Sequence, residues 1–511
     1  MKRLITSACA VACTATLVAC ANESKPHNPT PGPTPANAPA IYAEATSTPA
    51  PELTPTVTRH PIPIGTPTLD PPRPVPASSA MTVTYTVQRG DTLSGIAYAT
   101  GTTPDELQRL NGLRNPNALQ IGQQLLIRRQ IEGRTPSVKL IPDSELVNGP
   151  TAAEFDTAAF ISRQGGYLSR YTEVVAGEML TGAQIVQRVA EQFSVHPRIL
   201  LAALEHVGGW VTRAQPSDDQ LRYPLGYKRT NREGLNVQLN WAALRLNEGY
   251  YGWRLNTRSY VRLDDGTYFA IGEGVNAGTA GLQNYLAAIS TVPDWPEIAE
   301  NDGDRAFIHT YRRLFGNPWQ YDFGPLVPDD LKQPPFVLPW RKGEMWYFTG
   351  GPHSAWGAGT PWGALDFTPV TVAGCTELED WVTAVADGVI TRSVRGEVGQ
   401  SLDPSRDERI GWSVLYLHIG SRNRVPVGTQ VRAGDPIGHP SCEGGLAAAA
   451  HVHLARKYNG EWINAQGKVP FDLEGWVAVE GAREYDGALV NGDLRREPCE
   501  CKYPDLNGIV R

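Results

Sequence analysis

The amino-acid sequence has little net charge and contains no long basic run. Its 511 residues include 46 Lys and Arg against 53 Asp and Glu, which gives a formal net charge of −7. Nucleic-acid binding requires a concentrated positive surface, so no nucleic-acid partner is expected. The sequence also has no glycine-rich loop typical of phosphate binding, and beyond the first twenty residues no stretch is apolar enough to span a bilayer. The length predicts about three domains.

The N-terminus has the features of an export signal. Lys2-Arg3 precede a mostly apolar stretch from Leu4 to Ala19 that is too short for a membrane span. The tetrapeptide Leu-Val-Ala-Cys that ends at Cys20 resembles a bacterial lipobox. This resemblance implies that residues 1–19 are a signal peptide, that Cys20 is lipidated, and that the protein is a membrane-anchored, extracytoplasmic lipoprotein. Ordinary signal cleavage near Ala19 is the alternative.

Beyond the lipobox the chain has four cysteines, and this even number favours a disulfide framework in an oxidising compartment. Four cysteines allow three pairings. One residue separates Cys499 from Cys501, so a bond between these two would be strained. We therefore expect each of them to pair with Cys375 or Cys442. A second metal site is the other use of four cysteines.

Residues 20–80 form a proline-rich segment behind the lipobox. Residues 21–80 hold 16 of the 42 prolines, with Thr, Ala and Ser between them, so the segment cannot form a packed core. We expect an extended tether. At about 3.1 Å per residue it would reach up to roughly 190 Å, enough to carry the rest of the chain away from a membrane surface.

Residues 81–130 have the pattern strand, helix, helix, strand. The segment VTYTVQ alternates apolar and polar residues, Thr103 and Pro104 can begin a helix, and QQLLIR returns as a strand. The strings YTVQRGDTLSGIA, LQRLNGL and ALQIGQQLLI resemble the lysin-motif (LysM) family over the whole module. The resemblance implies a small βααβ fold that binds glycans rich in N-acetylglucosamine, with the candidate residues Gly90, Asp91, Thr92, Asn117 and Leu119. Alternatively, Asp91 and Thr92 serve only to cap a helix.

Residues 140–335 are dominated by helical periodicity. In TGAQIVQRVAEQF the apolar residues form one stripe, and Pro197 begins a second helix. The string LLAALEHVGGW loosely resembles the active-site helix of lysozyme-like transglycosylases, but Val207 occupies the position at which that helix carries its glutamate. Glu205 lies two residues earlier, and we expect a solvated or core-edge side chain there. We interpret the region as a helical domain of unknown role, either a spacer or a substrate-recognition domain.

From about residue 340 to the C-terminus the pattern changes to β. The strings AVADGVITRSV, WSVLYLHIG and AAAAHVHLARKY are rich in β-branched and aromatic residues, and glycine-bearing turns separate them. The chain is thus predicted to be a multidomain α+β protein. It combines the βααβ module, a mainly helical middle domain, and a C-terminal antiparallel β-sheet domain at 340–511.

The C-terminal domain contains the tripeptide His451-Val452-His453. Successive side chains of a strand point to opposite faces, so these two imidazoles face one pocket. Upstream, GGPHSAWGAGTPWGALDF and VLYLHIG add His353, Asp366 and His418. A catalytic zinc takes three protein ligands and leaves a position for water, so the set predicts a hydrolytic zinc site. The sequence has no His-Glu-x-x-His motif, which is consistent with an imidazole base.

The elements GGPH…LDF, LYLHIG, VRAGDPIG and HVHL, in this order, resemble the lysostaphin-type zinc endopeptidases of peptidoglycan. The resemblance implies one Zn²⁺ per chain with His353, Asp366 and His453 as ligands and His418 and His451 as catalytic residues. Most relatives separate the first His and the Asp by three residues, whereas twelve intervene here. The longer spacing, after Gly-Gly-x-His, resembles the beta-lytic, staphylolytic branch.

Two observations bear on the ligand set itself. No other histidine lies between residues 310 and 417, so His353 has no substitute nearby. His439, in IGHPS, is interpreted as a loop residue.

Together these features predict a membrane-tethered zinc endopeptidase that hydrolyses peptide cross-links of peptidoglycan. The LysM module would bind the glycan of the wall, and the C-terminal domain would bind its peptide. One alternative is a wall-binding lipoprotein without catalytic activity that regulates another hydrolase. A second alternative is glycan cleavage by the middle region. The sequence does not assign the bond that is cleaved, nor the separate roles of His418 and His451.

Overall fold

The structure is a computed structural model that describes residues 80–511, apart from residues 89, 101, 116, 118, 300–304, 370–373 and 377. The lipobox cysteine Cys20 and the proline-rich segment therefore lie outside the described residues. Within the described part of the chain, no helix combines the length and apolar character needed to cross a membrane.

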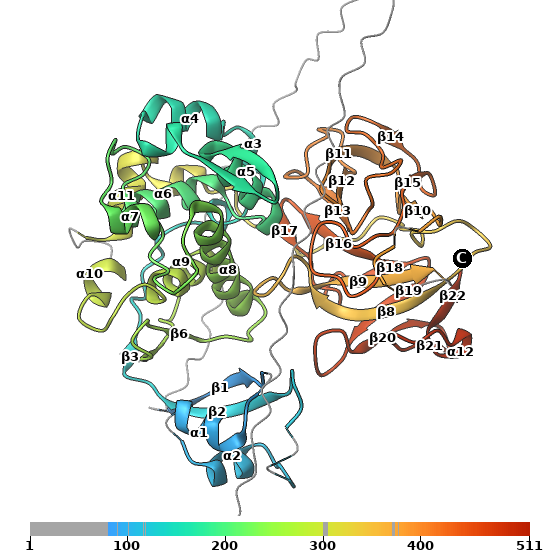
Figure 1. The fold of residues 1–511 in the computed structure, drawn as a ribbon, viewed down its shortest axis with the longest axis horizontal. Helices are drawn as coiled ribbons and strands as arrows, with labels where there is room; N and C mark the ends of the chain where they lie inside the picture. Colours follow the sequence, from blue (N-terminus) through green and yellow to red (C-terminus); the bar gives the residue numbers. More distant parts are fainter. Residues whose placement is uncertain are drawn as a thin grey trace, which may run out of the picture. The chain divides into compact units, whose positions relative to one another are not determined.

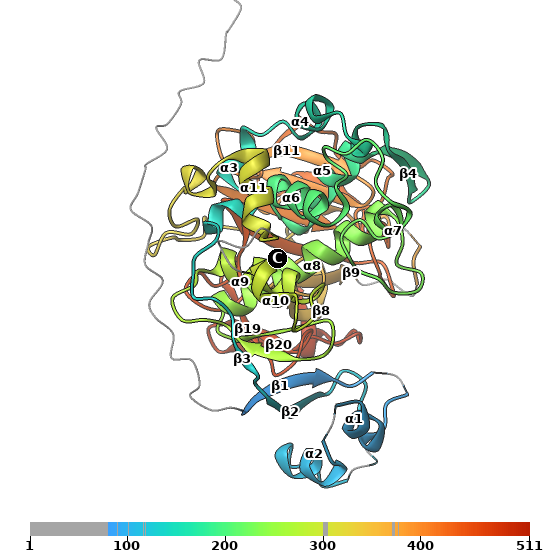
Figure 2. The same ribbon diagram turned by 90° about the vertical axis from the view of Figure 1, so that its left-hand side faces the viewer.

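The first described module is a two-stranded antiparallel sheet with two helices on one side of it (Figure 2). Val83 pairs with Ile127, and both side chains lie in a small apolar core with Leu107 from the second helix. Thr103 accepts a hydrogen bond from the backbone of Glu106 and so begins that helix, as its sequence indicates. The elements are β1 (Ala80–Thr86), α1 (Leu93–Thr100), α2 (Pro104–Leu110) and β2 (Gln124–Gln130).

The middle region is mainly helical and is built around one long buried helix, α8 (Leu235–Arg254). Helix α9 (Ala277–Ala287) is buried along its whole length and packs beside α8 (Figure 1). Helix α5 (Gly182–Phe193) turns the predicted apolar stripe into this core, and a capping box of Thr181 and Gln184 fixes its start. These contacts give the region one apolar core.

Short helices and small sheets complete the middle region, which is preceded by the two-residue strand β3 (Gly133–Arg134). The strands form a β4–β5 hairpin and a β3–β7–β6 sheet. The other elements are η1 (Asp143–Glu145), α3 (Pro150–Ala153), α4 (Thr157–Gln164), η2 (Tyr167–Arg170), β4 (Thr172–Val175), β5 (Glu178–Thr181), α6 (Pro197–Gly208), α7 (Asp218–Arg222), β6 (Tyr260–Arg262), β7 (Tyr268–Ala270), α10 (Trp295–Ala299), α11 (Phe307–Phe315) and η3 (Pro318–Tyr321).

The C-terminal region is dominated by a nine-stranded antiparallel sheet with the order β14-β11-β12-β13-β16-β9-β8-β22, to which β17 is added beside β16. The consecutive strands β8 and β9 lie next to each other, while β16 is inserted between β9 and β13. The sheet strands are β8 (Met345–Ser354), β9 (Trp362–Pro369), β11 (Gly388–Val394), β12 (Glu397–Ser401), β13 (Trp412–Leu417), β14 (Gln430–Val431), β16 (Val452–Tyr458), β17 (Glu461–Trp462) and β22 (Gly508–Val510).

Two smaller sheets flank the main one. Strands β10 (Val382–Thr383) and β15 (Pro436–Gly438) form a pair, and a four-stranded meander follows β17. The remaining elements are β18 (Asp472–Leu473), β19 (Trp476–Glu480), β20 (Gly487–Asn491), β21 (Leu494–Arg496) and the short helix α12 (Pro504–Asn507). The α+β organisation predicted from the sequence is confirmed.

The two faces of the nine-stranded sheet pack against different partners. On β16, Val452 and Leu454 belong to the core of the C-terminal domain, whereas Ala455 belongs to the core of the helical region. On β9, Leu365 and Ala364 divide in the same way. The alternation of a strand thus gives one face to each core. Since His453 shares the Ala455 face, the predicted site lies on the face that the helical region covers.

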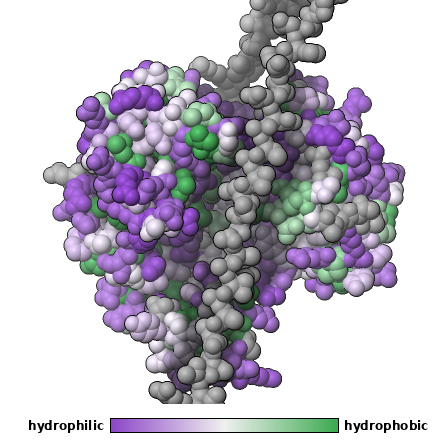
Figure 3. Space-filling model, viewed as in Figure 1, coloured by the Kyte–Doolittle hydropathy of each residue, from purple (hydrophilic) through white to green (hydrophobic). Residues whose placement is uncertain are grey.

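Hydrophilic residues cover most of the face of the molecule that Figure 3 presents. The large apolar side chains that are exposed include Tyr98 and Leu446, which lie far apart in the sequence, and Val174 and Met179, which stand opposite each other in the β4–β5 hairpin.

The expected pairing of Cys499 and Cys501 with the other two cysteines is wrong. The structure pairs Cys375 with Cys442, whose Cα atoms lie 5.3 Å apart. The loop after β9 and the loop before β16 meet here, because the Ala450 N–H donates to the Gly374 carbonyl at 3.0 Å. Because the two loops meet at this point, Cys375 and Cys442 lie side by side and pair with each other.

Cys499 and Cys501 are joined to each other, with Cα atoms 5.0 Å apart. The side-chain amide of Asn507 donates to the carbonyls of both residues, at 3.0 and 2.9 Å. This turn around a buried asparagine brings the two cysteines together, and the spacing argument had not allowed for it.

Candidate metal centre

Three strands bring the predicted ligands together. Asp366 of β9 stands directly opposite His453 of β16 in the sheet, and His353 lies near the end of β8, the next strand. One ligand atom from each of the three residues lies within 4.8 Å of the others. A Cβ at Gly350 would collide with the Asp366 side chain, so the glycine of GGPH makes room for this carboxylate. The long loop after His353 therefore does not separate it from the other two.

The protons on the two predicted ligand histidines can be placed from their backbone partners. His353 Nδ1 lies 2.8 Å from the Gly351 carbonyl, and His453 Nε2 lies 3.0 Å from the Ala355 carbonyl. A carbonyl only accepts, so each of these nitrogens carries the proton. In the neutral rings this leaves lone pairs on His353 Nε2 and His453 Nδ1, which are 3.0 Å apart. Two lone pairs that face each other at this distance require a positive group between them.

Asp366 adds a third lone pair to the same point. Its Oδ1 lies 3.4 Å from His353 Nε2 and 3.3 Å from His453 Nδ1, and this buried oxygen has no hydrogen-bond donor among the described residues. Burial opposes ionisation of the carboxyl, but His353, His451 and His453 lower its pKa below the ordinary value. An ionised carboxylate and two imidazole nitrogens are ligands that Zn²⁺ accepts. The donor set therefore fits a zinc ion.

The two predicted catalytic histidines lie beside this group. His418 follows β13, His451 precedes β16, and their ring centroids are 4.4 Å apart. His451 Nε2 lies 3.8 Å from Asp366 Oδ1. The Nδ1 atoms contact the carbonyls of Glu443 and Ala449, each at 2.8 Å, so the lone pair of each neutral ring is on Nε2. Burial, with His451 and His453, lowers the pKa of His418 to about 3, and its ring is neutral at physiological pH.

The loop of residues 442–450 supplies both carbonyls that orient His418 and His451. Its first residue, Cys442, is joined to Cys375. Ser441, just before it, donates from its N–H to the His418 carbonyl at 2.7 Å. The disulfide thus closes the loop on which the tautomers of His418 and His451 depend. The sequence reasoning did not connect the cysteines with the site.

Tyr485 is a site residue that the sequence reasoning missed. Its ring stacks on His353 with centroids 4.2 Å apart. Tyr485 is also 54% exposed, so it faces solvent at the edge of the site. Burial of the hydroxyl, with Asp366 and Glu484, raises its pKa to about 12, so the phenol stays protonated. It lies in an irregular turn before β20, where the string EYDG indicates only a turn. No signal in the sequence pointed to this contact.

Two further predictions can be placed in the structure. His439 lies in the loop just after β15, as the sequence indicated, and it is buried there: its Nδ1 contacts the Asp380 carbonyl at 2.9 Å and its ring packs on Trp381. Glu205 has the core-edge position that was one of the two expectations: it is buried, pairs with the exposed Arg313, and its carboxylate accepts from the backbone of Val211 and Thr212. It also accepts from Arg313 and the Thr212 hydroxyl, so both of its oxygens are used in local structure.

The predicted glycan-binding residues lie in two loops of the LysM module. The Gly122 N–H donates to the Val87 carbonyl, which joins these loops at one end of the sheet. Asp91 accepts from the Tyr85 hydroxyl and the Gln88 N–H, and Thr92 accepts from the Gly95 N–H at the start of α1. Asp91 and Thr92 therefore have structural partners of their own. The other candidates lie in the same two loops and are Gly90, Asn117 and Leu119.

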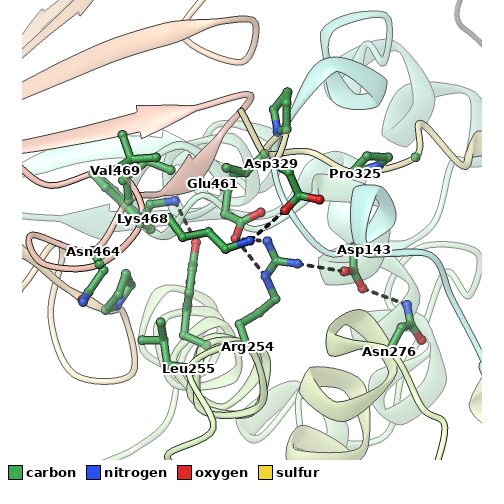
Figure 4. A pocket seen from close by; sticks show the side chains of 18 of the residues that line it. Asp143, Arg254, Leu255, Asn276, Pro325, Asp329, Glu461, Asn464, Lys468 and Val469 are labelled. Carbon is green, nitrogen blue, oxygen red and sulfur yellow. Dashed lines mark hydrogen bonds and ion pairs between the residues drawn. The ribbon is translucent and has the colours of Figure 1, made fainter. Parts of the chain in front are cut away.

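A pocket of about 720 Å³ lies away from the predicted ligands, where α8 and η1 meet the segment that follows β17. Figure 4 shows its charged side chains facing one another. Arg254 lies 3.0 Å from Glu461 and 4.0 Å from Asp143, and Lys468 lies 2.8 Å from Asp329. The charges of this pocket are satisfied largely by each other.

Two segments of the chain match known family models. Residues 139–330 match the model described as LasA, N-terminal domain, and residues 85–128 match the LysM domain. The chain therefore carries a LysM domain, as the sequence predicted, followed by a LasA N-terminal domain. The second match covers the region that was interpreted as a helical domain of unknown role.

Curated relatives match short segments. The chain is 38% identical to the N-acetylmuramoyl-L-alanine amidase XlyA of Bacillus subtilis over 60 residues, which cover 12% of this chain and 20% of that protein. It is 54% identical to the uncharacterised lipoprotein YgeR of Escherichia coli over 41 residues, which cover 8% and 16%. The chain thus spans a fifth or less of the length of these relatives.

Solved structures similar to the chain include the M23 metalloprotease pseudoalterin, with 24% identity, a TM-score of 0.28, and coverage of 33% of this chain and 97% of that one. A zinc-containing peptidase from Vibrio cholerae has 19% identity, a TM-score of 0.20, and coverage of 28% and 41%. The catalytic domain of lysostaphin from Staphylococcus simulans has 21% identity, a TM-score of 0.17, and coverage of 25% and 89%.

Proposed function

We propose that this chain, which carries a LysM domain and a LasA N-terminal domain, is a zinc endopeptidase that hydrolyses peptide cross-links of peptidoglycan. The observation that carries the proposal is the convergence of three lone pairs, from His353 Nε2, Asp366 Oδ1 and His453 Nδ1, beside two further imidazoles. Such a set needs a cation, and the neighbouring histidines give it a means of proton transfer.

His353, Asp366 and His453 would hold Zn²⁺. When bound, the ion supplies Lewis acidity, which activates water for attack and polarises the scissile carbonyl. The backbone contacts of His418 and His451 through Nδ1 leave Nε2 of each ring as the acceptor, so either Nε2 can take the proton of the attacking water. The protonated ring can then stabilise the oxyanion or give its proton to the leaving amine. The geometry supports both assignments, because the two rings lie side by side.

Two features support peptidoglycan as the substrate. The LysM family is identified with glycans rich in N-acetylglucosamine, and its two loops stand at one end of the module. A wall polymer held there would raise the local concentration of its peptide at the metal centre. The lipobox at Cys20 supports an extracytoplasmic, membrane-anchored location facing the wall, with the proline-rich segment as a tether.

The test uses the full chain with purified wall of several peptide compositions. The wild type should contain one zinc per chain and release peptide fragments, whose new ends mass spectrometry identifies. His453→Ala should lose both zinc and release, whereas His418→Ala and His451→Ala should keep zinc and lose about 10²–10⁴ in kcat. His439→Ala removes a buried histidine outside the group and serves as the matched control.

Each other outcome favours a different function. A wild type without stoichiometric zinc that still binds wall would favour the regulatory lipoprotein. Fragments with new sugar ends that disappear in Glu205→Gln would favour glycan cleavage by the middle region. Release of peptide by His453→Ala would show that the metal assignment is wrong.

A further inference from the structure

The loop between His353 and Asp366 packs on the helical region. Ala355 is fully buried in the core that the helical region and the sheet share, and the Trp356 ring contacts Phe193 at the end of α5 with centroids 6.5 Å apart. Gly359 approaches the backbone of α8 so closely that a Cβ there would lie 2.9 Å from the Leu244 carbonyl oxygen. The loop is thus held at three points.

The same loop touches a predicted metal ligand. The Ala355 carbonyl accepts from His453 Nε2 at 3.0 Å, and this contact places the lone pair of His453 on Nδ1, where it faces His353 and Asp366. A partner on the second nitrogen of a ligand histidine fixes its tautomer and its orientation. The position of Ala355 therefore controls one of the three ligands.

Within the loop the hydrogen bonds join loop residues to one another, and they include Thr360 donating from its hydroxyl to the Gly357 carbonyl at 2.8 Å. The Ala355 N–H donates to the Pro361 carbonyl at 3.0 Å, and the Thr360 hydroxyl accepts from the Trp356 N–H at 3.0 Å. The tip, Gly357 and Ala358, is exposed. Without α5 and α8, the apolar side chains at 355 and 356 would face water, and a loop of this length has many other conformations. The helical region supplies the missing constraint.

We propose that α5 and α8 of the LasA N-terminal domain act as a positioning element of the metal centre. They hold loop 355–361 through Phe193 and the close approach at Gly359, and the loop in turn holds His453 in its ligand tautomer. Trp356 and Gly359 are positioning residues, since neither touches the three ligand atoms. The proposal deepens the proposed function and rests on the zinc site named there.

Two glycines of the loop make a matched pair for the test. Gly359 and Gly357 have similar φ angles of +92° and +100°, so alanine is strained at both. Around Gly357 no atom lies within 4 Å of an added Cβ, whereas at Gly359 the Cβ would collide with α8 near Leu244 and Glu248. The difference between Gly359→Ala and Gly357→Ala isolates the contact with the helical region.

We expect Gly359→Ala to bind zinc about 10–100-fold more weakly than Gly357→Ala, the loss usual when the partner of a ligand histidine is disturbed. Zinc affinity is measured on the full chain by competition with a chelator, well below the unfolding temperature of both variants. In the metal-free proteins, ¹⁵N spectra of the 10 histidines report the His453 tautomer. Gly359→Ala should show a mixture of Nε2–H and Nδ1–H forms.

A second pair of variants covers the case in which Gly359→Ala does not fold. Phe193→Ala and Trp356→Ala should each weaken zinc binding, and the double variant should lose no more than the stronger single one, because both remove one contact. Phe155→Ala, which removes an aromatic ring that packs on Phe160 and Phe315 in the same domain, should leave zinc affinity within about threefold of the wild type.

The outcomes separate the two proposals. If the wild type binds no zinc, the proposed function fails and this inference fails with it. If the wild type binds zinc but Gly359→Ala and Gly357→Ala have equal affinities, and Phe193→Ala resembles Phe155→Ala, the helical region has no positioning role and only this inference is overturned.

Discussion

Two buried polar clusters lie on the same face of strand β16, one at each end. His453 is 6% exposed and Lys457 is 3% exposed, and Ala455 packs between them in the core shared with the helical region. At the Lys457 end the partners are opposite charges: Glu408 lies 3.3 Å from Lys457 and 3.1 Å from Arg392. At the His453 end three acceptor atoms face one another.

The two clusters differ in how many opposite charges and hydrogen-bond donors face their carboxylates. At the Lys457 end two carboxylates, Glu397 and Glu408, face two cations, and Gln192 from α5 adds a donor to Glu397. At the His453 end one carboxylate stands among imidazoles whose protons point elsewhere. Buried charge must be paired or bind a metal. The charges of the first cluster balance within the protein, whereas the acceptors of the second balance only with a cation, and we propose this second cluster as the functional end.

The largest effect should come from Asp366→Asn, which removes the charge of the functional end without changing its shape. We expect loss of stoichiometric zinc and at least a 10³-fold loss of peptide release, since a ligand carboxylate is gone. The metal-free variant should be as stable as the metal-free wild type or more so, because the amide can donate where the carboxylate only accepts. Metal analysis and thermal unfolding of the metal-free proteins check both statements.

A clear loss of stability in metal-free Asp366→Asn would break the comparison. It would mean that Asp366 is paired within the protein, as Glu408 is, and that the convergence of acceptors is a structural ion pair with a protonated histidine.

The next largest effect is expected at the other end, from Glu408→Gln. This change leaves Lys457 and Arg392 buried with one carboxylate fewer, which typically costs about 3–5 kcal/mol of unfolding free energy. Zinc content and kcat at a temperature where the variant is folded should stay within about threefold of the wild type. Denaturant unfolding measures the loss of unfolding free energy, and metal analysis of the same sample measures the zinc content. Loss of zinc in this variant would show that the two ends are not separate.

The sequence alone named the five candidate residues that the structure brings together, but not their surroundings. The alternation of His451 and His453 is a property of any strand, and Asp366 and His353 follow from ordered motifs. The carbonyls of Gly351, Ala355, Glu443 and Ala449, which set the four tautomers, are backbone atoms of loops, so no residue type marks them. Tyr485 was missed for the same reason, since its place depends on the path of a distant turn.

The fold shows a similar division. The apolar stripe of α5 and the alternation of β16 predicted helix and strand, because both patterns are local. The sharing of one core by the helical region and the sheet is a long-range contact between such segments as Phe193 and Trp356, and no periodicity reports it. The disulfide prediction failed because the short spacing between Cys499 and Cys501 does not reveal the turn of the chain there. The side-chain amide of Asn507 holds this turn through the carbonyls of both cysteines.

The His453 end and the Lys457 end of β16 should respond to acid at different pH values. Burial lowers the pKa of His353 from its ordinary value of 6.5, so protons compete with zinc there only below about that pH. At the other end, burial opposes ionisation of Glu408, but Arg392 and Lys457 lower its pKa from 4.5 to about 2. Its contribution to stability is therefore fully present above 4.5 and is lost as the pH falls toward 2.

The measurement follows zinc release and unfolding in one acid titration. Zinc affinity should fall by up to about a hundredfold per pH unit once the ligands protonate, since two imidazoles must each lose a proton to bind. The stability difference between the wild type and Glu408→Gln should be constant from pH 7 to pH 5 and shrink only below the ordinary glutamate pKa. If this stability difference already shrinks near pH 6.5, a histidine and not Glu408 determines the pH dependence of the Lys457 cluster.

The smallest effects should appear at Tyr485, the exposed edge of the functional end. Tyr485→Phe keeps the ring that stacks on His353, so zinc affinity should change by less than about threefold. Tyr485→Ala removes the stack and gives His353 room to rotate, and we expect a loss of about tenfold. A phenol with a pKa of about 12 is a donor at neutral pH, so a drop in kcat for Tyr485→Phe with unchanged zinc affinity would show that the hydroxyl contacts the reacting peptide. That result would extend the comparison, because the Lys457 end has no exposed residue of this kind among its described partners.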